Sequence, residues 1–427
     1  MGVFLLTFPF KKPIIILGFE QKLDVEKGDE WMYVNKILQR FYTGNDTEVN
    51  PDQIRGCLFG GAVGNALGYS VVFMSEDEIV NQFGEKGITE YQIARAGGKA
   101  MISDDTQMTL FTANGLLVAD TKAKIGGIQV WPRSYVAMAY QDWLRTQEMS
   151  YDDYRKTMED PEEASFHCVS WLSDIPELYS RRLPGNTCLS ALKIRKKSDY
   201  FADDYTKDVL NNSKGCGGVM RIAPVGLMYH KMNTLRLDGE AAQIAAITHG
   251  NSLGYMPAAM LTHIINRIVF PKEKLTLKQI VTEAIGKMME LFEGDEHLNE
   301  LADIVDLAIT LSENNESDRD NIRKIGEGWV AEETLAIAIY CALRHQDNFS
   351  EGIIASVNHA GDSDSTGAIC GNILGALLGY EKMEEKWKKD LELSDVIMEM
   401  ADDLCKWIQM SDKSKFDDPE WRKKYYR

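Results

Sequence analysis

Two short acidic clusters hold the side chains of this sequence that are best suited to chemistry. The first is Ser103-Asp104-Asp105-Thr106, and the second is Asp362-Ser363-Asp364-Ser365-Thr366, about 250 residues further along the chain. Within each cluster, carboxylates and hydroxyls stand close enough in sequence to converge on one hard cation from a single backbone turn. Neither cluster has a His or Cys spaced for zinc, so Mg²⁺ or Mn²⁺ is the expected metal.

Helix capping is the competing interpretation of both clusters. Each cluster ends a loop that contains glycine and opens a run with helical spacing, so a Ser or Asp there would satisfy free backbone N–H groups. One cap requires one such side chain, whereas each cluster has at least four oxygen-bearing side chains in a row. This excess, repeated at two loop-to-helix junctions, favours a shared metal site.

A third element is the glycine-rich run Gly215-Cys216-Gly217-Gly218. It is either a tight loop before an apolar segment or a loop whose N–H groups approach a pyrophosphate, which small residues permit. For Arg221, a buried structural ion pair is favoured over a phosphate contact. His249 follows an Ala-rich helix, where a structural role is usual. His359 precedes the second cluster and could hold its loop by hydrogen bonds.

Helices must position these groups, because apolar residues recur at helical spacing along most of the chain. The pattern predicts helices over 52–67, 76–83, 104–119, 132–146, 187–194, 238–248, 255–269, 277–292, 297–312, 333–345, 350–357, 365–378 and 393–409. Strand-like runs are few and short, and the connections contain Gly, Pro, Asn and Asp. The expected fold class is all-α.

The chain divides into three parts by composition. Residues 1–50 are an N-terminal extension, with an apolar part over 1–18 that forms either β-like segments or an arm, and an amphipathic stretch over 29–42. Residues 51–412 form the helical domain, and residues 413–427 form a charged tail. The acidic stretch 148–163 is expected to be a solvated loop or insertion.

The formal net charge of −18, from 47 basic and 65 acidic residues, argues against a general nucleic-acid-binding protein. No window reaches the ~18–20 apolar residues of a membrane span. The first apolar run is followed by its positive charges, which is atypical of a signal peptide. Seven cysteines without a CxxC pair indicate a reducing, cytoplasmic location and no disulfide framework.

Seven segments in order resemble the ADP-ribosylglycohydrolase family, which includes the dinitrogenase reductase-activating glycohydrolases. They are IRGCLFGGAVGNALG (54–68), SDDTQMT (103–109), PGNTCLSAL (184–192), SKGCGGVMRIAPVG (213–226), THGNSLGYMPAAML (248–261), GWVAEETLAIAIYC (within 326–341) and HAGDSDSTGAICGNILGALLG (359–379). The resemblance covers about residues 54–380. It implies a compact, orthogonal helical bundle around a binuclear centre of two Mg²⁺ or Mn²⁺ ions.

The resemblance also implies roles for individual residues. The implied metal ligands are Ser103, Asp104, Asp105, Asp362, Asp364 and Ser365. The implied contacts to ADP-ribose are Ser213, Gly215, Gly217 and His249.

Such a centre suits hydrolysis at the ribose anomeric carbon, which passes through an oxocarbenium-like state. Two metals can hold the ribose hydroxyls and lower the pKa of a bound water, and a nearby carboxylate can take the proton of that water. We assign this catalytic work to Asp105, Asp364 and Asp142. Asp142 lies at about the family's distance after the first cluster, although its local match is poor.

One segment departs from the family's pattern. Asn65 stands where the family usually has Asp, and Val72 stands where Glu is frequent. In some members that Glu gates or assists catalysis, so its loss argues against a serine-linked mechanism and leaves arginine-linked substrates open. The nearby acids Glu76-Asp77-Glu78 are expected to be solvated groups at a helix start.

The expected function is therefore a metal-dependent hydrolase that removes ADP-ribose from modified protein side chains, with arginine as the favoured linkage. The alternative is an immunity or binding protein that neutralises an ADP-ribosyltransferase toxin, partly through residues 1–50. The expected partners are an ADP-ribosylated protein and, for the alternative, that transferase, with no membrane partner. A non-catalytic member is a third possibility, but four retained acids argue against it, because buried like charges without a metal are costly.

Overall fold

The computed structural model describes residues 5–6, 14–15, 49–93, 98–127, 131–159, 168–228, 233–410, 416 and 418–427. The chain divides into two compact units, Met1–Thr43 and Gly44–Arg427. In the first unit, β1 (Leu5–Leu6) pairs antiparallel with β2 (Ile14–Ile15). The amphipathic stretch predicted over 29–42 lies outside the described residues.

The second unit is built from helices, and the all-α prediction is confirmed. Its α-helices are α2 (Pro51–Tyr69), α3 (Glu76–Phe83), α4 (Asp104–Gly126), α5 (Pro132–Glu148), α6 (Tyr151–Glu159), α7 (Asn186–Ile194), α8 (Ala223–Met228), α9 (Thr234–Ala246), α10 (Ser252–Val269), α11 (Leu277–Leu291), α12 (Leu298–Ser312), α13 (Asp318–Ile325), α14 (Ala331–Arg344), α15 (Phe349–Val357), α16 (Ser363–Leu378), α17 (Glu385–Lys388), α18 (Ser394–Gln409) and α20 (Pro419–Tyr425). Short 3₁₀ helices are η2 (Trp171–Asp174), η3 (Pro176–Leu178), η4 (Lys197–Phe201) and η5 (Cys216–Gly218).

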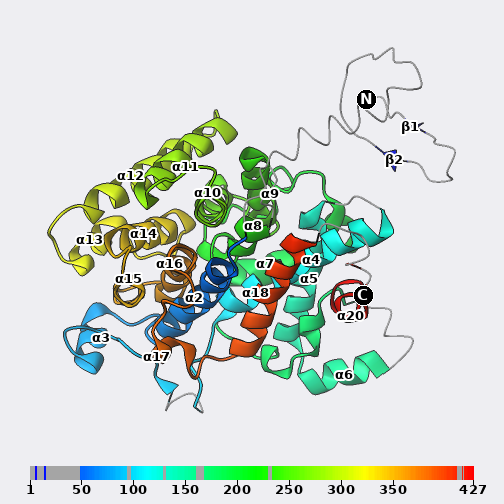
Figure 1. Ribbon diagram of the computed structural model, residues 1–427, viewed down its shortest axis with the longest axis horizontal. Coiled ribbons are helices and arrows are strands. Elements are labelled where there is room, and N and C mark those ends of the chain that lie inside the picture. The colour runs from blue at the N-terminus through cyan, green and yellow to red at the C-terminus, as the bar shows by residue number, and fades with distance from the viewer. Residues whose placement is uncertain are drawn as a thin grey trace. The chain divides into compact units, whose positions relative to one another are not determined.

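Helices α2 and α16 lie side by side at the centre of this unit (Figure 1). Helices α14 and α15 pack on α16, and α18 packs on α2. Helix α4 packs against α5 and also contacts α18. Nearly all of α2 and α16 is buried, so these two helices form the middle of the hydrophobic core.

Glycine recurs at every fourth position along the contact between α2 and α16. A Cβ atom added to Gly64 would lie 1.9 Å from the carbonyl oxygen of Gly367, and one added to Gly371 would lie 2.0 Å from that of Gly60. The same antiparallel register pairs Gly56 with Gly375 and Gly68 with Ser363. The two backbones therefore touch directly, which only glycine permits.

This glycine seam, which we define as Gly56, Gly60, Gly64 and Gly68 of α2 with Gly367, Gly371 and Gly375 of α16, positions the second acidic cluster. A Cβ on Gly68 would lie 2.1 Å from the oxygen of Ser363 and 2.7 Å from Cα of Asp364. The start of α16 is thus held against the end of α2, and Asp364 with it.

The predicted helices correspond to helices of the structure, with ends that differ by at most four residues, except that α4 continues to Gly126. The predicted set omits α8, α13 and α17, and two segments predicted as non-helical contain helices. The acidic stretch contains α6, which buries Tyr154 beside Tyr179. The charged tail contains α20, whose Trp421 is buried. In both segments, burial of an aromatic side chain by residues distant in sequence stabilises a helix that the polar local composition does not predict.

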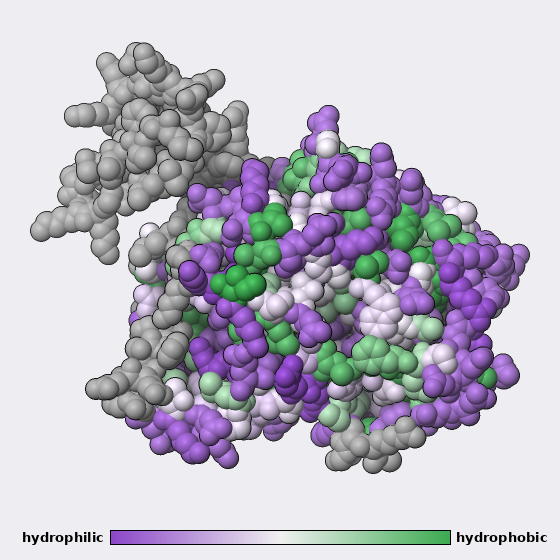
Figure 2. All heavy atoms as spheres, turned by 180° about the vertical axis from the view of Figure 1, so that it is seen from behind, coloured by the Kyte–Doolittle hydropathy of each residue, from purple (hydrophilic) through white to green (hydrophobic). Residues whose placement is uncertain are grey.

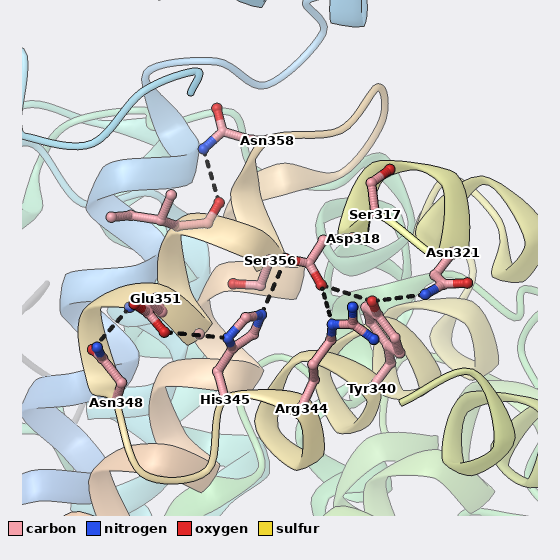
Figure 3. A network of polar contacts seen from close by, with 12 residues as sticks. Ser317, Asp318, Asn321, Tyr340, Arg344, His345, Asn348, Glu351, Ser356 and Asn358 are labelled. Carbon is pink, nitrogen blue, oxygen red and sulfur yellow. Dashed lines mark hydrogen bonds and ion pairs between the residues drawn. The ribbon is translucent and has the colours of Figure 1, made fainter. Parts of the chain in front are cut away.

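A polar network joins α13 to α14 (Figure 3). The Asp318 carboxylate accepts hydrogen bonds from Tyr340 Oη at 2.7 Å and His345 Nε2 at 3.1 Å, and it pairs with Arg344. Burial raises the pKa of Asp318, but the hydrogen bonds from His345 and Tyr340 outweigh it and leave the pKa below its usual value. The network therefore stabilises this helix junction with Asp318 ionised.

The surface in Figure 2 is mainly hydrophilic, with hydrophobic patches between the charged side chains. No helix among the described residues has both the length and the apolar character needed to cross a membrane. All seven cysteines are free thiols, and all except Cys216 are buried.

We predict that Gly64→Ala will destabilise the protein by about 3 kcal/mol, because the added methyl group meets backbone rather than a movable side chain. Gly286→Ala on α11 is the matched control: its Cβ would meet nothing within 4 Å, so a gain of about 0.5–1 kcal/mol is expected. Urea unfolding of both variants measures these changes. Equal stabilities of the two variants would show that the seam tolerates side chains.

Candidate active site

The first acidic cluster lies at the N-terminus of α4. Ser103 is the N-cap, with an extended backbone, and its side chain accepts a hydrogen bond from the amide of Asp105 at 3.4 Å. Capping therefore uses only the Ser103 side chain of this cluster, which leaves the two carboxylates for another role. Asp104 and Asp105 are both buried. Of the Asp104 carboxylate, Oδ2 accepts one hydrogen bond, from the amide of Gly185 at 3.3 Å.

The second acidic cluster lies at the N-terminus of α16. Asp362 occupies the N-cap position, but its side chain makes no capping hydrogen bond. Its amide donates to the oxygen of Glu327 at 2.9 Å, and Gly361 before it has φ +125°, with no room for a Cβ beside Glu327. The carboxylates of Asp362 and Asp364 are buried and are free of a capping role.

His359 and Thr366 hold this second loop from behind. His359 Nε2 lies 2.9 Å from Thr366 Oγ1 and 3.0 Å from the oxygen of Ser356, and Nδ1 lies 2.9 Å from that of Ala360. Burial lowers the pKa of His359. The predicted supporting role of His359 agrees with these contacts.

The two clusters share one electrostatic environment. Burial, followed by the charge of Asp364, raises the pKa of Asp104 to about 8. Burial raises the pKa of Asp105 well above its usual value, and the charges of Asp364, Asp104 and Asp362 add to the effect, which Ser365 partly offsets. Burial and Asp364 likewise raise the pKa of Asp362. Carboxylates from two distant parts of the chain therefore lie close enough to repel one another.

The donors of this group are of the kind that a hard divalent cation requires. Asp105 Oδ2 and Asp362 Oδ2 are buried without a hydrogen-bond partner, which is costly for a carboxylate that stays ionised. A bound cation would satisfy both oxygens and remove the mutual repulsion. In the described ranges, no three His, Cys, Asp or Glu side chains are grouped as a ready-made metal cage. The argument that these residues suit a divalent cation therefore depends on two observations: the ligand atoms are oxygens, and two of them have no hydrogen-bond partner.

Asn65 connects α2 to the first cluster. Its Oδ1 accepts from the Ser103 amide at 2.9 Å and from Thr106 Oγ1 at 2.8 Å, and its Nδ2 donates to Ser103 Oγ at 2.6 Å. The Ser103 amide can only donate, so the orientation of the Asn65 side chain is determined. Asn65 is fully buried and holds the loop that carries Asp104. The sequence showed it only as a departure from the family's Asp.

The glycine-rich run forms η5 and lies against the second cluster. Cys216 Sγ is 3.6 Å from Ser365 Oγ, and the Cys216 amide donates to the oxygen of Trp329. A Cβ on Gly217 would lie 2.8 Å from Cε1 of His249, so the run has to remain small there. Ser213 Oγ accepts from the amide of Gly215 at 3.3 Å. The four predicted ADP-ribose contacts are therefore neighbours: Ser213, Gly215, Gly217 and His249.

A hydrogen-bond relay sets the state of His249. Arg221 Nη2 donates to Thr248 Oγ1 at 2.7 Å, and that hydroxyl lies 2.8 Å from His249 Nδ1. The two ring nitrogens face different groups, Nδ1 the Thr248 hydroxyl and Nε2 the glycine-rich run. Burial and the charge of Arg221 lower the pKa of His249 to about 3. His249 is therefore a neutral ring with Nε2 on the side of the glycine-rich run.

The buried ion pair predicted for Arg221 is not among the contacts of the described residues; the Arg221 guanidinium donates to neutral groups, and its charge partly offsets the rise that burial causes in the pKa of Asp104. Arg221 is fully buried and lies over the ring of Tyr140, 4.3 Å from the ring centre. Its guanidinium also contacts Cys188 Sγ at 3.5 Å.

Asp142 has a different set of partners from the other predicted catalytic residues. Its Oδ2 accepts from the amides of Val169 at 2.8 Å and Ser170 at 2.9 Å, and its Oδ1 pairs with Arg145 at 3.0 Å. These contacts give Asp142 the role of holding the 168–170 segment. Its catalytic role stays a prediction that this geometry does not favour.

Glu76 also has a local explanation. It pairs with Arg323 and with Arg319 of α13, at the start of a helix whose N-cap, Ser75, forms a capping box with Glu78. Glu78 is a helix-start group as expected, whereas Glu76 is a partly buried, ion-paired carboxylate rather than a solvated one. Val72, where Glu is frequent in the family, is followed by Phe73, an exposed ring with φ +70°.

Comparison with known proteins relates this chain to one family. The sequence model of the ADP-ribosylglycohydrolase family matches residues 46–413. A protein of Archaeoglobus fulgidus is 26% identical over 361 residues, which cover 83% of this chain and 96% of that protein. Among solved structures, an ADP-ribosylglycohydrolase-related protein complex superimposes with a TM-score of 0.52 at 22% identity, over 84% of this chain and 98% of that one.

Two relatives have names that describe an activity. Mouse ADP-ribosylhydrolase ARH3 is 27% identical over 230 residues, which span 47% of this chain and 58% of the mouse protein's length. ADP-ribosylarginine hydrolase Tri1 of Serratia proteamaculans is 23% identical over 358 residues, covering 83% of this chain and 79% of that protein.

We predict that Asn65→Leu will lower stability by about 2–4 kcal/mol, because it leaves the buried amide of Ser103 without an acceptor. Asn65→Asp retains that acceptor and should lose less when Mn²⁺ is present. Urea unfolding with and without Mn²⁺ compares the two variants. A wild-type midpoint for Asn65→Leu would exclude the anchoring role.

We also predict that divalent cations stabilise this protein more at pH 8 than at pH 5. Without metal, folded Asp104 keeps its proton up to about pH 8, whereas the unfolded chain loses it near the ordinary aspartate pKa of 3.8. The folded state thus binds more protons in this window, and its stability falls as pH rises. Mn²⁺ replaces those protons, so the gain in Tm over EDTA should grow with pH. An equal gain in Asp105→Asn, or no gain at either pH, would contradict the metal site.

Proposed function

This chain belongs to the ADP-ribosylglycohydrolase family, and we propose that it is a hydrolase that removes ADP-ribose from modified protein side chains, with arginine as the linked residue. The observation that carries this proposal is the group of four buried, mutually repelling carboxylates at the N-termini of α4 and α16. Such a group destabilises the fold by itself, because buried unpaired charge is costly. A cationic ligand would compensate the charge and explain why the group is present.

Members of this family typically bind two Mg²⁺ ions. In this chain the ions would be held by Ser103, Asp104, Asp105, Asp362, Asp364 and Ser365. When bound, such ions supply charge for the sugar hydroxyls and lower the pKa of a bound water.

The protein's own groups would then do three things at the anomeric carbon. The acidic clusters would orient the ribose, because the glycine seam holds the start of α16 against α2 and Asn65 of α2 holds the loop before α4. The carboxylates would offset the positive charge that develops on the ribose in the oxocarbenium-like transition state. The Asp105 carboxylate, with Asp364 near it, would accept the proton of the attacking water.

The glycine-rich run and His249 would hold the rest of ADP-ribose. The backbone amides of a loop without side chains can approach a diphosphate closely. With its proton on Nε2, His249 would offer a neutral donor next to this loop, and its low pKa keeps the ring neutral across the neutral range. The diphosphate is thus expected beside Gly215 and Gly217.

Two observations support arginine as the linked residue. Tri1 of Serratia proteamaculans, a relative over most of this chain, is named an ADP-ribosylarginine hydrolase. Val72 also stands where a carboxylate is frequent in the family, so the serine-type gating group is absent from that position. A protonated guanidinium departs as neutral guanidine, whereas an unprotonated serine oxygen departs as an alkoxide, so the arginine linkage has less need of an additional acid.

The proposal predicts release of ADP-ribose from arginine-modified protein in the presence of Mg²⁺ or Mn²⁺, with less or none from serine- and cysteine-modified protein. Chromatography of the released ADP-ribose, with EDTA as the metal-free arm, measures this. Asp105→Asn and Asp364→Asn should each lower kcat by about 10²- to 10⁴-fold, the range of a lost catalytic acid or base.

Asp142→Asn is the matched control, because its carboxylate is engaged by Arg145 and the 168–170 segment. It should lower Tm while the folded fraction keeps kcat within a few-fold of wild type. No release from any modified protein with either metal would refute the proposed activity. A loss of kcat in Asp142→Asn as large as in Asp105→Asn would instead restore Asp142 to the catalytic group.

A further inference from the structure

Two exposed aromatic rings stack on one another beside the second acidic cluster. The ring centres of Phe73 and Trp329 are 5.4 Å apart, with 15° between their planes. Phe73 is 64% exposed and Trp329 is 38% exposed. Phe73 follows α2, and Trp329 lies in the loop that leads into α14. Two exposed rings in contact form a contiguous apolar patch, which is typical of a surface that binds a ligand or partner.

The loop that carries Trp329 is attached directly to the acidic cluster. Glu327 O accepts the amide of Asp362 at 2.9 Å, and Trp329 O accepts that of Cys216 at 3.3 Å. A Cβ on Gly328 would lie 3.7 Å from that of Asp362. The pair therefore stands at the edge of the proposed active site.

Phe73 reaches the pair from the other side of the same cluster. Gly68 of α2 is packed on Asp364, and Phe73 follows five residues later with φ +70°. This backbone region disfavours a bulky residue by roughly 1–2 kcal/mol. Strain combined with exposure at the edge of a site is a pattern associated with function rather than with stability.

A carboxylate completes the group. Trp329 Nε1 donates to Glu327 Oε2 at 3.1 Å, and Glu327 is exposed. The loop itself is fixed, because the amides of Glu327 and Gly328 both donate to Glu333 Oε2 at 3.0 Å. Flat rings with an adjacent carboxylate match the planar, cationic guanidinium group, which stacks on aromatic faces and pairs with acids. An ammonium lacks the plane, and a serine oxygen lacks the charge.

We propose that Phe73, Trp329 and Glu327 bind the guanidinium of the arginine from which ADP-ribose is removed. This inference rests on the proposed function in its arginine-linked form. It places the ribose on the acidic clusters and the side chain of the modified protein on the aromatic pair. The aromatic pair thereby selects the linkage. It takes the place of the Glu that is frequent in the family at the position of Val72.

Binding of agmatine to the full chain with Mg²⁺ tests the site without requiring catalysis. Putrescine is the matched probe, since it has an ammonium where agmatine has the guanidinium. Calorimetry should show agmatine binding at least about 5-fold tighter than putrescine. Phe73→Ala and Glu327→Gln should each weaken agmatine by about 5- to 30-fold and leave Tm within a few degrees of wild type.

The control variant is Trp131→Phe, an exposed tryptophan at the start of α5. It should bind agmatine as wild type does. With arginine-modified protein as substrate, Phe73→Ala should raise KM and change kcat little, a split that general loss of folding would not give.

Equal affinity for agmatine and putrescine, or wild-type agmatine affinity in both Phe73→Ala and Glu327→Gln, would overturn this inference. Release of ADP-ribose from modified protein would then still support the proposed function. The two claims thus fail separately, because agmatine binding is measured on unreacted protein.

Discussion

Direct backbone contact between α2 and α16 is the constraint on which the rest of the helical unit depends. The glycine seam fixes the register of the two helices, and its last pair, Gly68 with Ser363, holds Asp364 in place. The same α2 also carries Asn65, whose amide anchors the loop before α4. One helix therefore positions both acidic clusters. Helices in direct backbone contact cannot move relative to one another without a steric clash. The packing of α2 and α16 can therefore hold carboxylates close together despite their mutual repulsion.

The helices were largely predictable, because most of them bury an apolar stripe whose period is visible in the sequence. Helices α6, α13 and α20 were not, because their own residues are mainly polar. Tyr154 and Trp421 are buried by partners that lie elsewhere in the chain, and Trp421 Nε1 donates to Thr121. No local pattern reveals such contacts. The glycine spacing of α2 and α16 was visible, but its meaning required knowing which two helices meet.

The acidic clusters were predictable for a similar reason, since both are local and in excess of what a helix cap needs. Their supporting groups were not predictable. Asn65 acts on residues 38 and 41 positions away, and Phe73 stacks on a ring in a loop beyond α13, so both roles depend on the tertiary path. Asp142 shows the opposite case. Its position in sequence suggested catalysis. In the structure, its Oδ2 accepts hydrogen bonds from the backbone amides of the 168–170 segment, which no local pattern predicts.

Asn65 has a consequence for the charge balance of the site. Asp104, Asp105, Asp362 and Asp364 already repel one another, and an aspartate at position 65 would add a fifth buried carboxylate near them. The neutral amide avoids that added charge while retaining the acceptor for Ser103. Because an amide does not titrate, this anchor is the same at every pH, unlike the carboxylates that it supports.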